Sequence, residues 1–214
     1  MNVLLVDDHQ MMRDGLRAVL EREADIKVVG EASDGRAALE LCATLRPDVV
    51  VMDIGMPGLN GIEATRLMAQ RHAGARVVGL SMNNDRRYVH AMFEAGAWGF
   101  LVKSCASDEL IRALRAVASG EKYVSPAVAS SVLESFLHGS RPPAEDPRDA
   151  LSPRECEVLQ LIAEGLTSKE VAVRLDVAAS TVETHRKQIM AKLGLHSVAE
   201  LTKFAVRSGL TTLE

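Results

Sequence analysis

The chain has 214 residues, of which 47% are apolar and 25% charged, an ordinary composition for a globular protein. Its net charge of −4 gives no sign of nucleic-acid binding over the chain as a whole. No apolar run approaches the ~20 residues of a membrane helix, acids interrupt the opening stretch before a signal peptide could form, and the three cysteines are too scattered for a disulfide framework, so we expect a soluble, cytoplasmic protein.

Five short apolar runs alternate with helical patterns over the first 120 residues. The runs are rich in Val and Leu and lie at Val3–Val6, Lys27–Gly30, Val49–Met52, Val77–Leu80 and Gly99–Val102. Continuous runs of this kind are typical of strands buried on both faces of a parallel sheet. The segments between them repeat apolar residues at helical spacing. The alternation therefore predicts a doubly wound α/β domain with a five-stranded parallel sheet.

The strand signal stops after Gly120. Residues Pro126–Leu137 are compatible with one helix, and residues 138–150 contain Gly, Ser, three prolines and mixed charges, as exposed linkers do. We therefore expect one domain over residues 1–120, a linker over 121–150 and a second domain over 151–214.

The pattern from Leu151 onward is wholly helical. Four candidate capping boxes, each a Ser or Thr followed three residues later by Glu, mark helix starts at Ser152/Glu155, Thr167/Glu170, Ser180/Glu183 and Ser197/Glu200. Gly165 and Gly194 fall where two of these helices should end. The pattern predicts an all-α domain of four short helices.

The charge is divided unevenly between these domains. Residues 148–214 contain nine Lys or Arg and nine Asp or Glu, and the remaining 16 basic and 20 acidic residues leave the whole surplus of −4 upstream. An acidic front beside a neutral end is a weak indication of two different partners.

Polar side chains stand at the carboxyl ends of four predicted strands. Asp7 and Asp8 follow the first strand, Asp53 the third, Ser81 the fourth and Lys103 the fifth. Ligands of a doubly wound sheet bind at this edge. Three carboxylates placed together there need a cation, and Mg²⁺ is suitable because it prefers oxygen ligands. Together these groups could accept a phosphoryl group. Any single carboxylate could instead be a solvated turn residue, a reading that explains all five residues poorly.

Three segments resemble the receiver domain of two-component response regulators: Leu5–His9, Asp53–Pro57 with Gly61, and Gly99–Lys103. The resemblance covers about residues 1–120 and implies a flavodoxin-like fold. It implies that Asp53 is the phosphoacceptor, that Lys103 pairs with the phosphoryl oxygens, and that Ser81 supplies a switching hydroxyl. Mg²⁺ would be held by Asp7, Asp8, Asp53 and the backbone carbonyl of Gly55. Phe100 occupies the aromatic switch position, where it can act only through packing because it lacks a hydroxyl.

The predicted third helix of the second domain, Ser180–Leu193, has a cationic, hydrogen-bonding outer face and an inner stripe of Val182, Ile189 and Leu193. Such a helix suits the major groove of DNA, although four helices could also form a plain bundle. Residues 151–210 resemble a LuxR-type helix-turn-helix, through Leu151–Glu155, Glu164–Ala172, Ser180–His185 and Lys192–Gly194. The two resemblances together indicate a NarL/FixJ-type transcriptional regulator.

By the second resemblance, the base-facing positions are Glu183, Thr184 and Lys187, and the phosphate contacts are Thr167, Ser168, Lys169, Thr181, Arg186 and Lys192. Glu183 departs from the cation that many relatives carry, and it either completes its capping box or accepts from a cytosine amine. The neutral charge of this domain predicts modest affinity per monomer. We therefore expect a phosphorylated homodimer on double-stranded DNA, with half-sites ~34–36 Å apart.

The resemblance implies a sensor histidine kinase, or a small acyl phosphate, as the phosphoryl donor. The added charge of about −1.5 to −2 would draw Ser81 and Lys103, and Phe100 would repack inward. The chain would be no turnover enzyme beyond slow autodephosphorylation. Two alternatives stay open: a regulator that works without phosphorylation, and a Mg²⁺-dependent phosphatase. The phosphatase is disfavoured because such enzymes place a second acid where this chain has Gly55.

Overall fold

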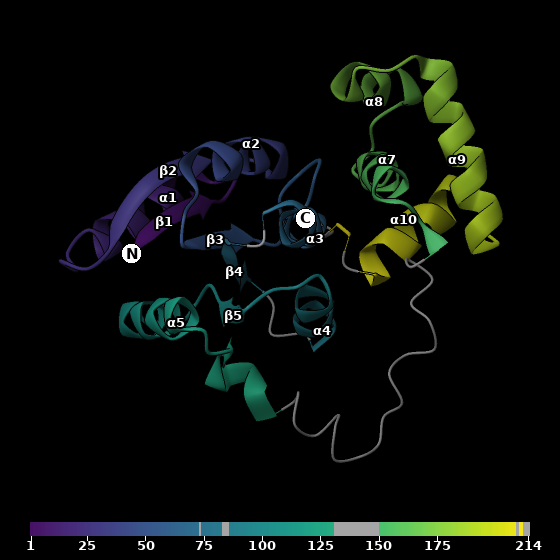
Figure 1. Ribbon diagram of the computed structural model, residues 1–214. Coiled ribbons are helices and arrows are strands. Elements are labelled where there is room, and N and C mark those ends of the chain that lie inside the picture. Colours follow the sequence, from purple (N-terminus) through teal and green to yellow (C-terminus); the bar gives the residue numbers. More distant parts are fainter. Residues whose placement is uncertain (73, 83–85, 131–149, 209, 212–214) are drawn as a thin grey trace. The chain divides into compact units, whose positions relative to one another are not determined.

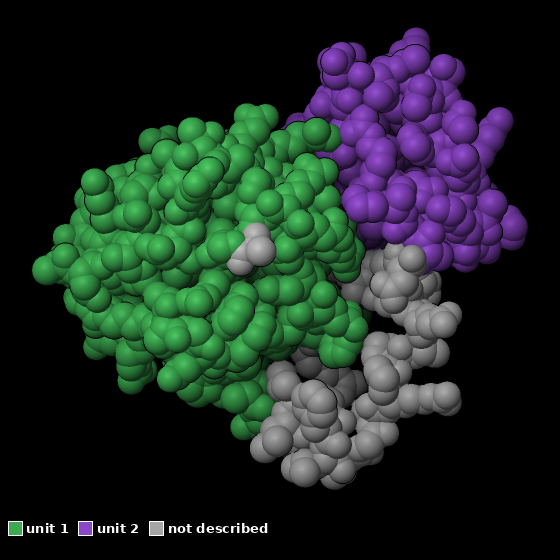
Figure 2. All heavy atoms as spheres, in the orientation of Figure 1, with its two compact units in different colours: residues 1–139 green, residues 140–214 purple. Residues whose placement is uncertain are grey.

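The computed structural model describes all residues except 73, 83–85, 131–149, 209 and 212–214. The chain divides into two compact units, residues 1–139 and residues 140–214, which Figure 2 colours separately. Each unit has a hydrophobic core of its own. Within the described ranges, no helix is both long and apolar enough to cross a membrane.

The first unit is a parallel sheet with helices on both faces (Figure 1). Its strands lie in the spatial order β2-β1-β3-β4-β5-β6, and their bounds are Asn2–Val6 (β1), Lys27–Ala32 (β2), Val49–Asp53 (β3), Arg76–Ser81 (β4), Gly99–Val102 (β5) and Tyr123–Val124 (β6). The helices are Gln10–Leu20 (α1), Gly35–Leu45 (α2), Gly61–Arg71 (α3), Arg86–Glu94 (α4) and Ser107–Ser119 (α5). The order reverses between β1 and β3, so the topological switch point lies there.

The continuous apolar runs are buried on both faces, as the sequence predicts. In β1, Leu4 and Val6 belong to the core beneath α2, α3 and α4, whereas Val3 and Leu5 belong to the core beneath α1 and α5. A strand that serves two cores needs apolar residues at every position rather than at alternate ones. The doubly wound, flavodoxin-like fold class is therefore confirmed.

The expected number of strands needs one correction, because the sheet has six strands instead of five. The added strand, β6, has two residues and pairs with β5. The amide of Tyr123 donates to the carbonyl of Trp98 at 3.0 Å, and the amide of Ser125 to that of Phe100 at 2.9 Å. Two residues have no periodicity to detect, and this strand depends on pairing with a neighbour 24 residues earlier, Gly99 with Tyr123.

The helix expected over Pro126–Leu137 is described only at its start. Residues 126–130 are helical, and the rest of that prediction, with nearly all of the proline-rich stretch over residues 138–150, lies outside the described residues.

The second unit contains α7 (Pro153–Ala163), α8 (Ser168–Leu175), α9 (Ala179–Leu193) and α10 (Val198–Arg207). Three of the predicted capping boxes are present, at the starts of α7, α8 and α10. Gly165 and Gly194 have positive φ angles just beyond α7 and α9, where the left-handed conformation ends a helix. Buried Val182 and Ile189, with Leu193 packed against the same core, confirm the inner stripe of α9.

The remaining predicted capping box, Ser180/Glu183, is wrong. Helix α9 begins at Ala179 with Ala178 as its N-cap residue, and no side chain caps it. Ser180 therefore lies inside the first turn. The carboxylate of Glu183 is bound elsewhere, by the hydroxyl of Ser168 on α8.

Candidate functional site

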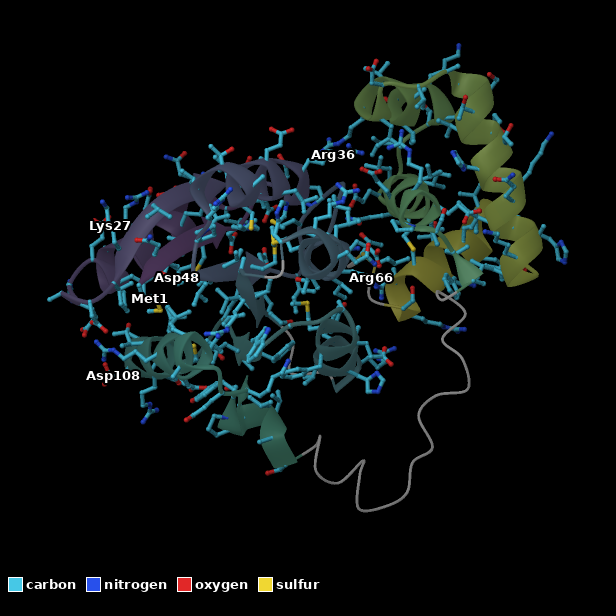
Figure 3. The ribbon with its side chains drawn as sticks, viewed as in Figure 1. Met1, Lys27, Arg36, Asp48, Arg66 and Asp108 are labelled. Carbon is cyan, nitrogen blue, oxygen red and sulfur yellow. The ribbon has the colours of Figure 1, made fainter. Side chains whose placement is uncertain are left out.

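An acidic cluster lies where β1 and β3 end, beside the switch point. Asp7, Asp8, His9 and Asp53 each offer one ligand atom, and these atoms lie within 4.8 Å of one another. The two strands are direct neighbours in the sheet, which brings their carboxyl ends together. Asp48 lies at the opposite end of the sheet, where Figure 3 labels it beside Met1. Its carboxylate accepts from the backbone amide of Asn2 at 2.6 Å and is not part of the cluster.

Gly61, the first residue of α3, allows the main chain at the end of β3 to pack closely. A Cβ atom at this position would stand 2.0 Å from the backbone oxygen of Asp53 and 2.9 Å from the Cα of Ile54. The amide of Gly61 donates to the carbonyl of Ile54 at 3.2 Å. No side chain fits at this position, so the local packing requires glycine.

Lys103 joins two carboxylates of the cluster. Its Nζ lies 2.7 Å from Oδ2 of Asp7 and 2.8 Å from Oδ2 of Asp53. All three side chains are buried, with 5% or less of each exposed. The lysine follows β5, and its backbone amide donates to the carbonyl of Ser81 at 2.7 Å, which fixes where the side chain starts. The structure thus brings together residues from the ends of β1, β3 and β5.

Burial and the neighbouring charges together shift the pKa values of this cluster. Burial raises the pKa of Asp53, and the Lys103 ammonium offsets only part of that increase. Burial also opposes the charge on Lys103, but the two carboxylates that its ammonium binds outweigh this effect and raise its pKa. The pKa values of Lys103 and Asp53 are thus both raised, and a further cation bound beside Asp53 would favour its ionised form.

The donor set fits a hard divalent cation. Oδ1 of Asp8 is buried and makes no hydrogen bond to any described residue. Nδ1 of His9 lies 2.9 Å away from it, and this contact is an ion pair only when the imidazole is protonated. One ammonium faces two of the three carboxylates, so negative charge remains, and oxygen ligands of this kind are those that Mg²⁺ and similar ions prefer. The amide of Gly55 donates to Oδ1 of Asp53 at 3.2 Å, which places this glycine beside the cluster.

The two expected switch residues are both buried. Ser81 ends β4 with 5% of its surface exposed, next to β5 in the sheet. Phe100 is fully buried in the core beneath α2, α3 and α4. The inward movement expected of Phe100 on phosphorylation would thus start from a ring that is already inside.

The second unit presents a polar face on α8 and α9. Exposed members of the predicted DNA-contacting set are Thr167, Lys169, Thr181, Thr184, Lys187 and Lys192, and partly exposed members are Ser168, Glu183 and Arg186. A turn at Asp176, whose φ is 51°, ends α8. The arrangement is a short helix, a tight turn and a longer helix with a polar outer face, as a helix-turn-helix requires.

Two cations of this face already have carboxylate partners, which sequence reasoning missed. Nζ of Lys192 lies 2.6 Å from Oε2 of Glu155, and a guanidinium nitrogen of Arg186 lies 3.2 Å from Oε2 of Glu183. Glu155 also closes the capping box of α7 with Ser152. Burial opposes its charge, but Lys192 and this cap outweigh the effect and lower its pKa.

A receiver fold joined to a helix-turn-helix defines a class of DNA-binding regulators, and comparison with known proteins agrees. Residues 3–115 match the family model of the response regulator receiver domain, and residues 149–205 match that of bacterial regulatory proteins of the luxR family. The chain therefore belongs to the NarL/FixJ family of two-component response regulators.

Curated relatives and a solved structure match nearly the whole chain. The response regulator UvrY of Escherichia coli K12 is 38% identical over 213 residues, which cover 100% of this chain and 97% of that protein. The nitrate/nitrite response regulator protein NarL of the same organism is 38% identical over 198 residues, covering 92% and 91%. The structure of the RcsB–DNA complex matches with a TM-score of 0.60 and 31% identity, covering 97% of this chain and 98% of that one.

Proposed function

We propose that the protein is a phosphorylation-dependent transcription factor in which Asp53 accepts a phosphoryl group from a sensor histidine kinase. One observation carries this proposal: the Asp53 carboxylate is buried at a strand end, bound by the Lys103 ammonium and grouped with two further aspartates. A solvated turn residue has no such surroundings. The protein is a regulator without turnover, beyond slow autodephosphorylation of Asp53. It works in the cytoplasm, where its three free cysteines stay reduced.

Asp7, Asp8 and Asp53, with the backbone carbonyl of Gly55, would hold Mg²⁺. Bound there, the ion would neutralise charge on the phosphoryl group during transfer. The buried Oδ1 of Asp8, which lacks a hydrogen bond to the described residues, supports this ligand set. Slow hydrolysis aside, the chain lacks the second acid of aspartyl phosphatases, because residue 55 is glycine.

Lys103 would exchange one of its two carboxylate partners for a phosphoryl oxygen. The modification adds about −1.5 to −2 of charge, and Lys103 is already within 2.8 Å of the accepting carboxylate. Ser81, at the end of the adjacent strand, would supply the hydroxyl that binds the same group. A shift of the ratio of active to inactive conformation from 1:99 to 99:1 takes about 5.5 kcal/mol of differential binding. A few charge-assisted hydrogen bonds in a buried site can supply this free energy. Phe100 would report the change by packing alone.

The helix-turn-helix would read an operator as a dimer. Glu183, Thr184 and Lys187 occupy the base-facing positions, and the phosphate contacts are Thr167, Ser168, Lys169, Thr181, Arg186 and Lys192. The chain would then comprise a receiver over residues 1–120, a linker over 121–150 and a DNA-binding domain over 151–214. The compact units 1–139 and 140–214 support a boundary within that linker.

Phosphorylation of Asp53 is tested with acetyl phosphate, Mg²⁺ and the variant Asp53→Asn. Wild type should shift on a Phos-tag gel and bind operator DNA more tightly, whereas the variant should do neither. Asp48→Asn is the matched control, because it makes the same substitution at the other end of the sheet and should behave as wild type.

The outcome separates the two kinds of regulator. A regulator that works without phosphorylation would show no Phos-tag shift and equal DNA binding with and without the donor. Enhancement of binding by the donor to the same extent in wild type and Asp53→Asn would exclude Asp53 as the acceptor.

A further inference from the structure

Glu183 lies on the polar outer face of α9, yet both oxygens of its carboxylate already have partners within the protein. Oε1 accepts from the hydroxyl of Ser168 at 2.5 Å, and Oε2 lies 3.2 Å from the guanidinium of Arg186. About 40% of the side chain is exposed, so these contacts form at the surface rather than in the core. The capping role is excluded by the start of α9 at Ala179. A different role is needed for this carboxylate.

The bond to Ser168 connects the two helices of the helix-turn-helix. Ser168 is the first residue of α8, and Glu183 is in the second turn of α9. Both helices also contribute to one apolar core, through Val171 and Leu175 of α8 and Val182 of α9. Apolar packing sets how closely the helices approach but has no direction. A hydrogen bond to a charged acceptor is short and directional, so it can also fix how α9 is rotated.

The same bond limits what either side chain can do on DNA. A serine hydroxyl has one proton to donate. While that proton is donated to Glu183, it cannot be donated to a phosphate oxygen, which only accepts, so Ser168 would contact a phosphate through its backbone amide at the start of α8. Equally, the bonds from Ser168 and Arg186 fix the direction of the Glu183 carboxylate and leave only part of its acceptor capacity for a cytosine amine, and a free carboxylate would be repelled by the phosphates.

We propose that Glu183 is a positioning residue that ties α9 to the first turn of α8 and orients Arg186, and that it reads no base. Sequence is then read by its neighbours Thr184 and Lys187. This inference rests on the proposed DNA-binding function and deepens it. It replaces both earlier readings of this glutamate, as a capping partner and as an acceptor for cytosine.

The test compares two variants of the full-length, acetyl-phosphate-treated protein that remove the same charge. Glu183→Gln keeps an oxygen that can accept from Ser168, and Glu183→Ala does not. Each is combined with Ser168→Ala, and binding is measured on an operator that the wild-type protein selects from random DNA. We expect Glu183→Ala to bind about fivefold more weakly than Glu183→Gln, the ratio for one lost hydrogen bond. Ser168→Ala should lower the affinity for this operator about fivefold when residue 183 is Gln and less than twofold when it is Ala.

The preferred operator sequence distinguishes a positioning residue from one that reads a base, because only loss of a base-reading residue changes that preference. Glu183→Gln and Glu183→Ala should select the same operator sequence as wild type. Thr184→Ala is the positive control and should relax the preference at one position. The proposal is overturned if Glu183→Ala changes the preferred base, or if Ser168→Ala costs the same factor in both backgrounds.

The same four variants are unfolded with urea in the absence of DNA, followed by far-ultraviolet circular dichroism. The midpoint loss from Ser168→Ala should be larger in the Glu183→Gln background, which keeps an accepting oxygen, than in the Glu183→Ala background. Equal losses would overturn the tie between α8 and α9. If wild type selects no DNA sequence at all, the proposed function fails, whereas the unfolding comparison still tests the tie.

Discussion

Replacing Gly61 with alanine should destabilise the first unit and impair phosphorylation of Asp53. The new Cβ would lie 2.0 Å from the backbone oxygen of Asp53, where ordinary contact begins at 3.4 Å. A second obstacle, the Cα of Ile54, stands at 2.9 Å. Both are main-chain atoms, so no side-chain rotation relieves the clash, and the end of β3 must move away from α3. Overpacking usually costs 1–3 kcal/mol, and we expect about 3 kcal/mol here because backbone has to shift.

The single tryptophan, Trp98, lies in the first unit, so its fluorescence follows unfolding of that unit alone. Urea titration of Gly61→Ala should show the loss of about 3 kcal/mol, and the melting temperature should fall by about 10 °C. Acetyl phosphate should label the variant more slowly on a Phos-tag gel, because the clash displaces the main chain that positions the carboxylate of Asp53, the proposed acceptor.

Gly15 supplies the control. It lies inside α1, and a Cβ there meets no atom within 4 Å. Gly15→Ala should therefore leave phosphorylation unchanged and stabilise the protein by about 0.5–1 kcal/mol, the usual gain of alanine over glycine in a helix. If Gly61→Ala matched Gly15→Ala in stability and labelling, the reasoning from the close approach would be refuted.

Three further results are expected. Lys103→Met leaves two buried carboxylates without their shared cation, so the free energy of unfolding at pH 7 should fall by about 3–5 kcal/mol and recover partly with Mg²⁺, whereas an unchanged urea midpoint would contradict this role. Burial raises the pKa of Asp53 above the ordinary value of 3.8, so the folded state holds that proton more tightly than the unfolded chain does. In EDTA, the stability of wild type relative to Asp53→Asn should therefore fall as the pH rises from 3.8 through the raised folded value, and a rise would be inconsistent with it. Glu155→Ala loses a helix cap and a cross-helix ion pair and should cost about 2 kcal/mol in a circular dichroism melt. Glu170→Ala loses only an exposed cap and should stay closer to wild type, so equal losses would show that the ion pair contributes nothing.

Most of the first unit could be predicted because its strands are continuous apolar runs that serve two cores at once. Val49–Asp53, for example, is buried at every position and can hardly be anything but a central strand. Tyr123–Val124 could not be predicted, since two residues carry no period and form a strand only by pairing with β5.

The sequence was sufficient to predict which strand ends meet at the site. Asp7, Asp53 and Lys103 follow strands that a doubly wound sheet aligns at one edge, so their convergence follows from topology. The binding of both carboxylates by the Lys103 ammonium could not be predicted. It depends on the length and rotamer of the lysine side chain, and a sequence pattern holds no information on either. The same limit explains the error at Glu183, where a capping-box pattern was present but a hydroxyl on another helix bound the carboxylate.

The ion pair between Lys192 and Glu155 has a consequence for how binding responds to salt. Protein–DNA affinity falls with ionic strength in proportion to the cations that displace condensed counterions from the duplex. Lys192 must leave Glu155 to do this, and Arg186 shares its guanidinium with Glu183, which offsets part of its charge. A single chain should therefore displace few counterions, and its affinity for DNA should depend only weakly on salt. Two chains bound together should double the slope of log affinity against log salt concentration. Ionic strength should then weaken the complex of two chains with DNA more than it weakens the complex of one chain.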